Sequence, residues 1–333
     1  MNSKTLLAAA GIAAFAFSPA YATEGGDQMT KPGALIGSSA GVPPPGIYMF
    51  NQVFTYQANL AGPGTAALNP PGTHKTGVQA AVDVQGFLFV PGWTFLGASY
   101  DAVIVQPFVM QSLGNPINAQ AAGMFNTYIV PVELSWKLGT SGFAVKTGLG
   151  IYLNDATVNG ANGLGGQGNP YWTYQPELIL SYLKDGWNLT AAIYAEFNTA
   201  NTVTHYTTGD LLHADFTATK TIGKWTFGPV AYYVGQVSND SCPTSCIATG
   251  ESTLLHSQRY DVWAVGGLVG YDFGPASLSV WATQEVSAKA SNAAAAAAGG
   301  DPSVVAEGTT VFATLSYRLW APDEPTKPAM YHK

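Results

Sequence analysis

The sequence predicts an all-β fold, a transmembrane antiparallel up-and-down β-barrel of about 12 strands, with about 14 as the alternative count. Only 10% of the 333 residues are charged, against roughly 25% in soluble domains, so charges for a soluble surface are lacking. The mean hydropathy of +0.11 is nevertheless too low for a bundle of membrane helices, whereas strands that alternate apolar and polar residues give such an average. A soluble β-sandwich is the alternative, but its outward strand faces would carry charges.

Residues 1–22 have the features of a secretory signal peptide. Lys4 supplies the positive charge, residues 6–17 are apolar, and Ala20-Tyr21-Ala22 forms a cleavage site of small residues. The apolar stretch is too short to span a bilayer as a helix. We therefore expect export, cleavage after residue 22, and a bacterial outer-membrane location for a barrel of this kind.

The mature chain divides into three parts. Residues 23–45 are rich in Gly and Pro, which predicts an irregular, partly extended periplasmic lead-in. Residues 46–320 consist of segments in which apolar and polar residues alternate, separated by turn residues, as expected for the barrel. Residues 321–333 contain several prolines and are expected to form a flexible periplasmic tail.

The clearest strand pattern lies at 187–198. Trp187, Leu189, Ile193 and Phe197 share one face, and polar residues fill most of the other. An aromatic residue at each end of an apolar face is what a lipid-facing strand needs at the two membrane interfaces. With boundary errors of about ±2–4 residues, we expect strands near 46–60, 75–90, 93–109, 124–138, 143–155, 171–183, 187–200, 211–222, 225–239, 259–273, 276–289 and 308–320.

The connections between these strands alternate in length. A barrel in the outer membrane has short periplasmic turns and longer outer loops, so the short turns and both chain ends are expected to face the periplasm. The expected short turns lie at 91–92, 139–142, 185–186, 223–224 and 274–275, and the expected long loops at 61–73, 111–123, 156–170, 201–210, 240–258 and 291–307.

Charged residues on the strands are expected to face the lumen. Glu133 and Lys146 lie near pairing register on adjacent strands, and Glu177 and Glu196 also lie on adjacent strands. Two close carboxylates could share a proton or perform acid–base chemistry, but in a wet barrel they more often bind water or a basic group, so no catalytic residue is expected. A cation-favouring lumen is the milder functional interpretation. The full set is Asp83, Glu133, Lys146, Glu177, Glu196, Asp215, Glu285 and Arg318.

A second polar group lies where the loop at 201–210 enters the next strand. Tyr206, Asp210, His213 and Asp215 could line the pore as a constriction or ligand contact. The alternative is a structural network that holds the loop to the wall, because interior polar groups must find partners.

The two cysteines, Cys242 and Cys246, lie in one expected outer loop. In an oxidising compartment such a pair usually forms a disulfide. A metal site with His256 is the alternative, but it would be an incomplete zinc set, so neither a metal nor a cofactor is expected. The net charge of −7 with 13 basic residues argues against a nucleic-acid partner.

Three stretches together resemble one protein family. They are Gly25-Gly26 with residues 43–48, the block from Asn201 to Asp215, and the segment 225–240. This pattern resembles the MetA-pathway of phenol degradation family of outer-membrane proteins. The resemblance implies an outer-membrane barrel that passes aromatic or other hydrophobic compounds, and it carries over no catalytic residue.

The functional hypothesis is therefore a passive outer-membrane channel for small hydrophobic or aromatic compounds, with outer-membrane lipid or lipopolysaccharide and such a solute as partners. One alternative is an outer-membrane lipid hydrolase using a histidine such as His213, although Asp215 rather than a serine follows it at the expected spacing. The other is a non-conducting structural or surface-interaction barrel, which a lumen filled by residues 23–45 would favour. The sequence does not indicate the oligomeric state.

Overall fold

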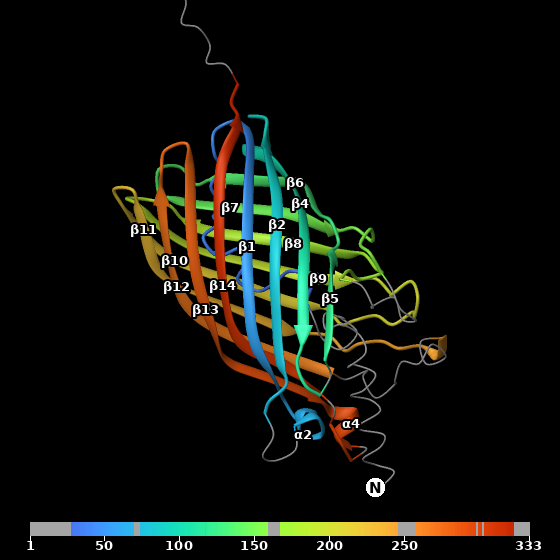
Figure 1. Cartoon of the computed structure of the whole chain (residues 1–333). Coiled ribbons are helices and arrows are strands. Elements are labelled where there is room, and N and C mark those ends of the chain that lie inside the picture. Colours follow the sequence, from blue (N-terminus) through green and yellow to red (C-terminus); the bar gives the residue numbers. More distant parts are fainter. Residues whose placement is uncertain are drawn as a thin grey trace, which may run out of the picture.

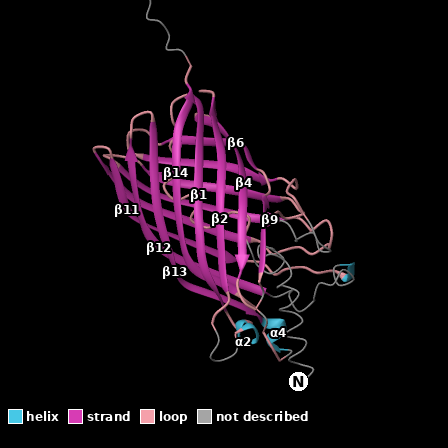
Figure 2. Ribbon diagram, viewed as in Figure 1, coloured by secondary structure: helices cyan, strands magenta, loops and turns pink. Residues whose placement is uncertain are grey.

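The computed structural model describes residues 28–69, 74–116, 118–158, 167–245, 258–297, 299–301 and 303–322. Strands dominate this part of the chain, and its helical segments include the short α2 (Thr65–Leu68) and α4 (Ala293–Ala297) (Figures 1 and 2). None of the described helices is long and apolar enough to cross a membrane.

Twelve long strands form one closed antiparallel barrel, which confirms the predicted fold (Figure 1). Neighbours along the chain pair with each other, β1 pairs with β14, and every one of these pairings is antiparallel. The strands are β1 (Gly46–Ala61), β2 (Gly77–Val90), β4 (Ala98–Leu113), β6 (Tyr128–Lys137), β7 (Phe143–Tyr152), β8 (Thr173–Tyr182), β9 (Trp187–Asn198), β10 (Leu211–Ile222), β11 (Trp225–Gln236), β12 (Gln258–Asp272), β13 (Ala276–Asn292) and β14 (Val305–Trp320).

Two further strands extend the sheet next to β4. The two-residue β3 (Thr94–Phe95) pairs with its beginning, and β5 (Ala119–Met124) pairs with its end. The prediction of a long loop at 111–123 is therefore wrong, because β4 continues to Leu113 and β5 starts at Ala119. The residues of β5 have weak strand preferences of their own, so the neighbouring strand supplies the pairing that their composition does not indicate.

The outward face of the barrel carries an apolar belt with aromatic side chains toward its ends. Near the short turns, the ring of Tyr271 lies 4.7 Å from Trp225 and 4.8 Å from Phe273. Toward the loops, Trp263 lies 4.8 Å from Tyr233 and stacks on Phe216 at 6.5 Å. Aromatic rings at both borders of an apolar belt are typical of a barrel that spans a membrane.

On β1, β2 and β4 several apolar side chains face the lumen, although polar residues were expected inside and apolar residues outside. Val82 and Val84 face the lumen, and Asp83 between them faces outward, where it accepts a hydrogen bond from the Asn51 amide at 2.6 Å. The prediction that Asp83 faces inward is therefore wrong. The physical reason is that this sector of the lumen is apolar, so the aliphatic residues of β2 take the inner positions.

The segment at 28–45 runs through the inside of the barrel, whereas the sequence suggested a lead-in outside it. At the loop end, the Tyr260 hydroxyl of β12 donates to the Gln28 side chain at 2.9 Å. At the other end, Arg318 near the end of β14 donates to the Pro45 carbonyl. Because these contacts lie at opposite ends of the wall, the segment crosses the lumen lengthwise before β1 begins.

Candidate functional site

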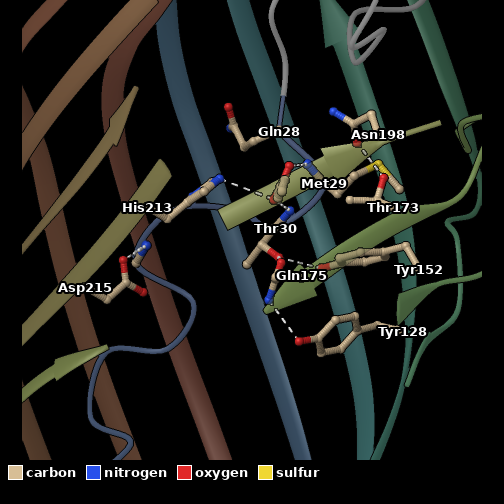
Figure 3. A network of polar contacts seen from close by, with 12 residues as sticks. Gln28, Met29, Thr30, Tyr128, Tyr152, Thr173, Gln175, Asn198, His213 and Asp215 are labelled. Carbon is tan, nitrogen blue, oxygen red and sulfur yellow. Dashed lines mark hydrogen bonds and ion pairs between the residues drawn. The ribbon is translucent and has the colours of Figure 1, made fainter. Parts of the chain in front are cut away.

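Two carboxylates of the wall hold the N-terminal segment by its backbone. Glu196 on β9 accepts hydrogen bonds from the backbone N–H groups of Met29 and Thr30, both at 2.8 Å. Asp215 on β10 accepts from the N–H groups of Gly33 at 3.0 Å and Leu35 at 2.9 Å. Figure 3 shows Asp215 facing the segment. Hydrogen bonds to charged acceptors are stronger than neutral ones, so these carboxylates anchor the segment.

A chain of neutral side chains continues this contact on the neighbouring strands (Figure 3). The Thr30 hydroxyl donates to Gln175 Oε1 at 2.5 Å and lies 2.7 Å from the Tyr152 hydroxyl. Gln175 Nε2 in turn donates to the Tyr128 hydroxyl at 2.8 Å. The polar edges of both tyrosines are thus satisfied, and their rings remain available as apolar surface.

Beside the segment lies an internal cavity of about 170 Å³. An apolar protein cavity of about 150 Å³ is large enough to bind benzene, so a single aromatic ring fits this space. Most of its lining is aliphatic or aromatic, because the reversed faces of β1, β2 and β4 meet here. The lining residues are Gln28, Met29, Thr30, Lys31, Ala34, Leu35, Phe50, Gln52, Phe54, Val82, Val84, Val105, Pro107, Val109, Phe125, Tyr128, Tyr152 and Gln175.

Next to this cavity the wall has a seam that side chains help to close. The pairing of β4 with β6 ends at Val105, and its pairing with β5 starts at Phe108. Between them, the Gln106 amide donates to the Phe125 carbonyl at 2.9 Å and accepts from the Thr127 hydroxyl at 2.7 Å. Val105 lines the cavity from inside, so the seam lies between the cavity and the outer surface.

The structure brings the predicted pair of Glu133 and Lys146 together, with Glu133 Oε2 and Lys146 Nζ 3.2 Å apart. It adds Asp101, which lies 3.1 Å from the same ammonium group and which the sequence analysis missed. The position of Asp101 on the same strand face as the lumen-lining Val105 is the signal that could have identified it. All three side chains are buried.

The other predicted carboxylate pair is separated. Glu177 pairs across the strands with Tyr194 and lies beside Gly148, near Glu133. Glu196 instead has its Oε1 atom 3.3 Å from Nε2 of His213. The two glutamates thus belong to two different interior clusters.

The remaining predicted residues take different places. His213 stacks on the ring of Tyr194 inside the barrel, with ring centres 4.5 Å apart. The Tyr206 hydroxyl donates to Asp240 at 2.5 Å, and Ser238 donates to Asp210 at 3.0 Å. Tyr206 and Asp210 thus contact the segment that follows β11, and whether they line the solute path stays a prediction.

Cys242 is buried, whereas Cys246 and His256 lie outside the described residues. The disulfide between the two cysteines stays a prediction. Arg318, expected in the lumen, lies at the end of the barrel, where its guanidinium is 5.6 Å from the centre of the Tyr48 ring.

Comparisons with known proteins bear on the fold and on the family. The model of the family described as “Putative MetA-pathway of phenol degradation” matches residues 52–299. Among solved structures, the outer membrane channel from Pseudomonas putida F1 has 9% identity and a TM-score of 0.65, with coverage of 86% of this chain and 99% of that one. At that identity the likeness concerns the fold.

A second solved structure is less similar. The translocator domain of the autotransporter NalP from Neisseria meningitidis has 10% identity and a TM-score of 0.46, with coverage of 83% of this chain and 89% of that one. No curated protein sequence matches this chain.

Proposed function

Because this chain belongs to the MetA-pathway of phenol degradation family of outer-membrane β-barrels, we propose that it is an outer-membrane channel for passive passage of small hydrophobic or aromatic compounds. The observation that carries the proposal is the apolar cavity of about 170 Å³ inside the barrel. A water-filled pore for polar solutes would have a polar lining, whereas here aliphatic and aromatic side chains form most of it.

The energetics of such a cavity favour apolar solutes. Transfer of apolar surface out of water contributes roughly 25 cal/mol per Å², so a ring that leaves water for this cavity is stabilised. The segment at 28–45 occupies the lumen lengthwise, and polar solutes would have to displace its hydrogen bonds to Glu196 and Asp215. An apolar solute has a shorter route, because the seam at Gln106 lies directly beside the cavity.

The occupied lumen also supports a second candidate, a barrel that does not conduct and serves a structural or interaction role. A lipid hydrolase receives less support. His213 is fully buried inside the barrel between Tyr194 and Glu196, and one solved structure with this fold is an outer membrane channel.

A transport assay separates the first two candidates. Liposomes that carry lipopolysaccharide in the outer leaflet and contain the purified protein should take up a neutral aromatic such as toluene faster than the same liposomes without protein, as read by an aromatic-degrading reporter enzyme trapped inside. Val105→Trp fills the cavity and should slow this uptake. Ile104→Trp is the matched control, because the neighbouring side chain points outward and is 49% exposed. Equal uptake with and without protein would favour the structural candidate.

A further inference from the structure

The only ammonium group lining the described cavity belongs to Lys31 of the N-terminal segment. Its Nζ atom lies 3.7 Å from the centre of the Tyr56 ring and 6.0 Å from that of Tyr232. A cation held over aromatic rings is attracted by their negative faces, and this arrangement is how proteins bind organic ammonium ligands. Tyr56 and Tyr232 thus form two sides of an ammonium cage.

The third side of this cage is Glu285 of β13. Its carboxylate accepts hydrogen bonds from the hydroxyls of Tyr56 at 2.8 Å and Tyr232 at 2.6 Å, and from the backbone N–H of Gly308 at 2.7 Å. Lys31 Nζ is the most distant of its partners, at 3.5 Å. The wall itself therefore holds this carboxylate in place, so the cage does not depend on Lys31 for its shape.

The charge of the lumen favours cations over anions. Among the described lumen residues, carboxylates outnumber ammonium groups, and charges in such a low-dielectric interior interact more strongly than in water. An anionic ligand would be repelled unless it found a cation of its own. The carboxylates are Asp101, Glu133, Glu177, Glu196, Asp215 and Glu285, against the ammonium groups of Lys31 and Lys146.

We propose that the cage of Tyr56, Tyr232 and Glu285 is a subsite for primary ammonium ligands, which Lys31 occupies as an internal stand-in. The ligand class is an arylalkylamine, with its ring in the apolar cavity and its ammonium in the cage in place of that of Lys31. The inference deepens the proposed function and rests on it, because Lys31 lines the cavity while its ammonium lies in the cage, so the cage adds a polar anchor beyond the cavity lining. The tethered Lys31 competes at a high effective concentration, so its removal should strengthen binding.

The test is titration calorimetry on the full chain in lipid nanodiscs, with empty nanodiscs subtracted. The probes are 2-phenylethylammonium, its neutral isostere propylbenzene, and the anion 3-phenylpropanoate. Lys31→Met removes the internal ammonium and keeps the length of the side chain. It should bind 2-phenylethylammonium about tenfold more tightly than the unaltered protein and leave the affinity for propylbenzene nearly unchanged. Lys289→Met, at an exposed position on β13, is the matched control and should change neither.

Loss of the Glu285 carboxylate should remove the increase in affinity for 2-phenylethylammonium. The double variant Lys31→Met, Glu285→Gln should bind 2-phenylethylammonium no better than propylbenzene. If this double variant does not fold, Lys31→Met combined with Tyr232→Phe provides a second measurement of the same loss of affinity. Lys31→Met binding the ammonium probe no more tightly than the unaltered protein, or binding 3-phenylpropanoate equally well, would overturn the subsite. If propylbenzene still binds in that case, the proposed passage of neutral aromatic compounds is retained without the ammonium subsite. If no neutral aromatic binds to any variant, the proposed function itself fails.

Discussion

At Gly148 the wall has no side chain where β7 passes two carboxylates. A Cβ atom there would lie 2.8 Å from Glu177 Oε1 and 3.1 Å from Glu133 Cγ, closer than such atoms pack without movement. Overpacking of this kind typically costs about 1–3 kcal/mol, so we expect Gly148→Ala to lower the free energy of unfolding by that amount.

Urea titration of the refolded barrel in lipid vesicles measures this change. Gly267→Ala is the control, because the nearest atom to its added Cβ would be the Gly228 carbonyl oxygen at 3.9 Å. Its stability should stay within about 0.5 kcal/mol of the unaltered protein. Equal losses in both variants would show that the carboxylate cluster is not the cause.

Residue identities predicted one of the two expected contacts within the lumen, and they predicted the inward face for most but not all of the charged residues. Parity along a strand identifies the residues that share a face, and this was enough to place Glu133 beside Lys146. Parity does not say which face is inward. For Asp83 the usual rule of polar inside failed, because the wall around the cavity needs apolar residues there.

The N-terminal segment is the element on which the conductance of the barrel depends. Deletion of residues 28–42 should raise the single-channel conductance several-fold, because the wall of twelve strands closes without them. Glu196 and Asp215 would then lose their backbone partners and face water, so the enlarged pore should favour cations.

Planar-bilayer recording of the full chain and the deletion variant checks this expectation. A reversal potential measured across a KCl gradient gives the ion preference. Unchanged conductance in a correctly folded deletion variant would contradict the placement of the segment in the lumen.

At the level of elements, local signals predicted what depends on neighbours in sequence. The turns at 139–142 and 223–224 and the strands that they join were predicted within the expected error. The interior position of the N-terminal segment has no local signal, because its partners, such as Asp215 for Gly33, lie 182 residues away in sequence. The segment is held by its backbone N–H groups, which nearly every residue has, so its own sequence does not indicate where it lies. Its position in the lumen is set by the carboxylates of the assembled wall.

For the whole molecule, the apolar outer belt should make stability depend on the depth of an added charge. Val265 on β12 is 51% exposed and lies on the outer face between Trp263 and Tyr271. Val265→Arg should lower the free energy of unfolding in bilayers by about 2 kcal/mol, the lower end of the cost of a basic residue at the middle of the membrane, because Val265 lies nearer to Trp263 than to Tyr271.

Val237→Arg is the matched change outside the belt, since Val237 is 52% exposed and follows the end of β11 at the loop side. It should cost at most about 1 kcal/mol. Both variants can be compared by denaturant unfolding in the same lipid vesicles. A cost at Val237 equal to that at Val265 would place the membrane border elsewhere on the wall.

The most direct measurement is the position of a bound aromatic molecule inside the barrel. Crystals of the full chain soaked with bromobenzene would locate the ring by the anomalous signal of bromine. We predict a peak between Phe54, Phe125 and the N-terminal segment at Thr30, which Val105→Trp removes. Bromine found solely in the detergent around the outer belt, with the cavity empty, would contradict a lumen that receives small apolar compounds.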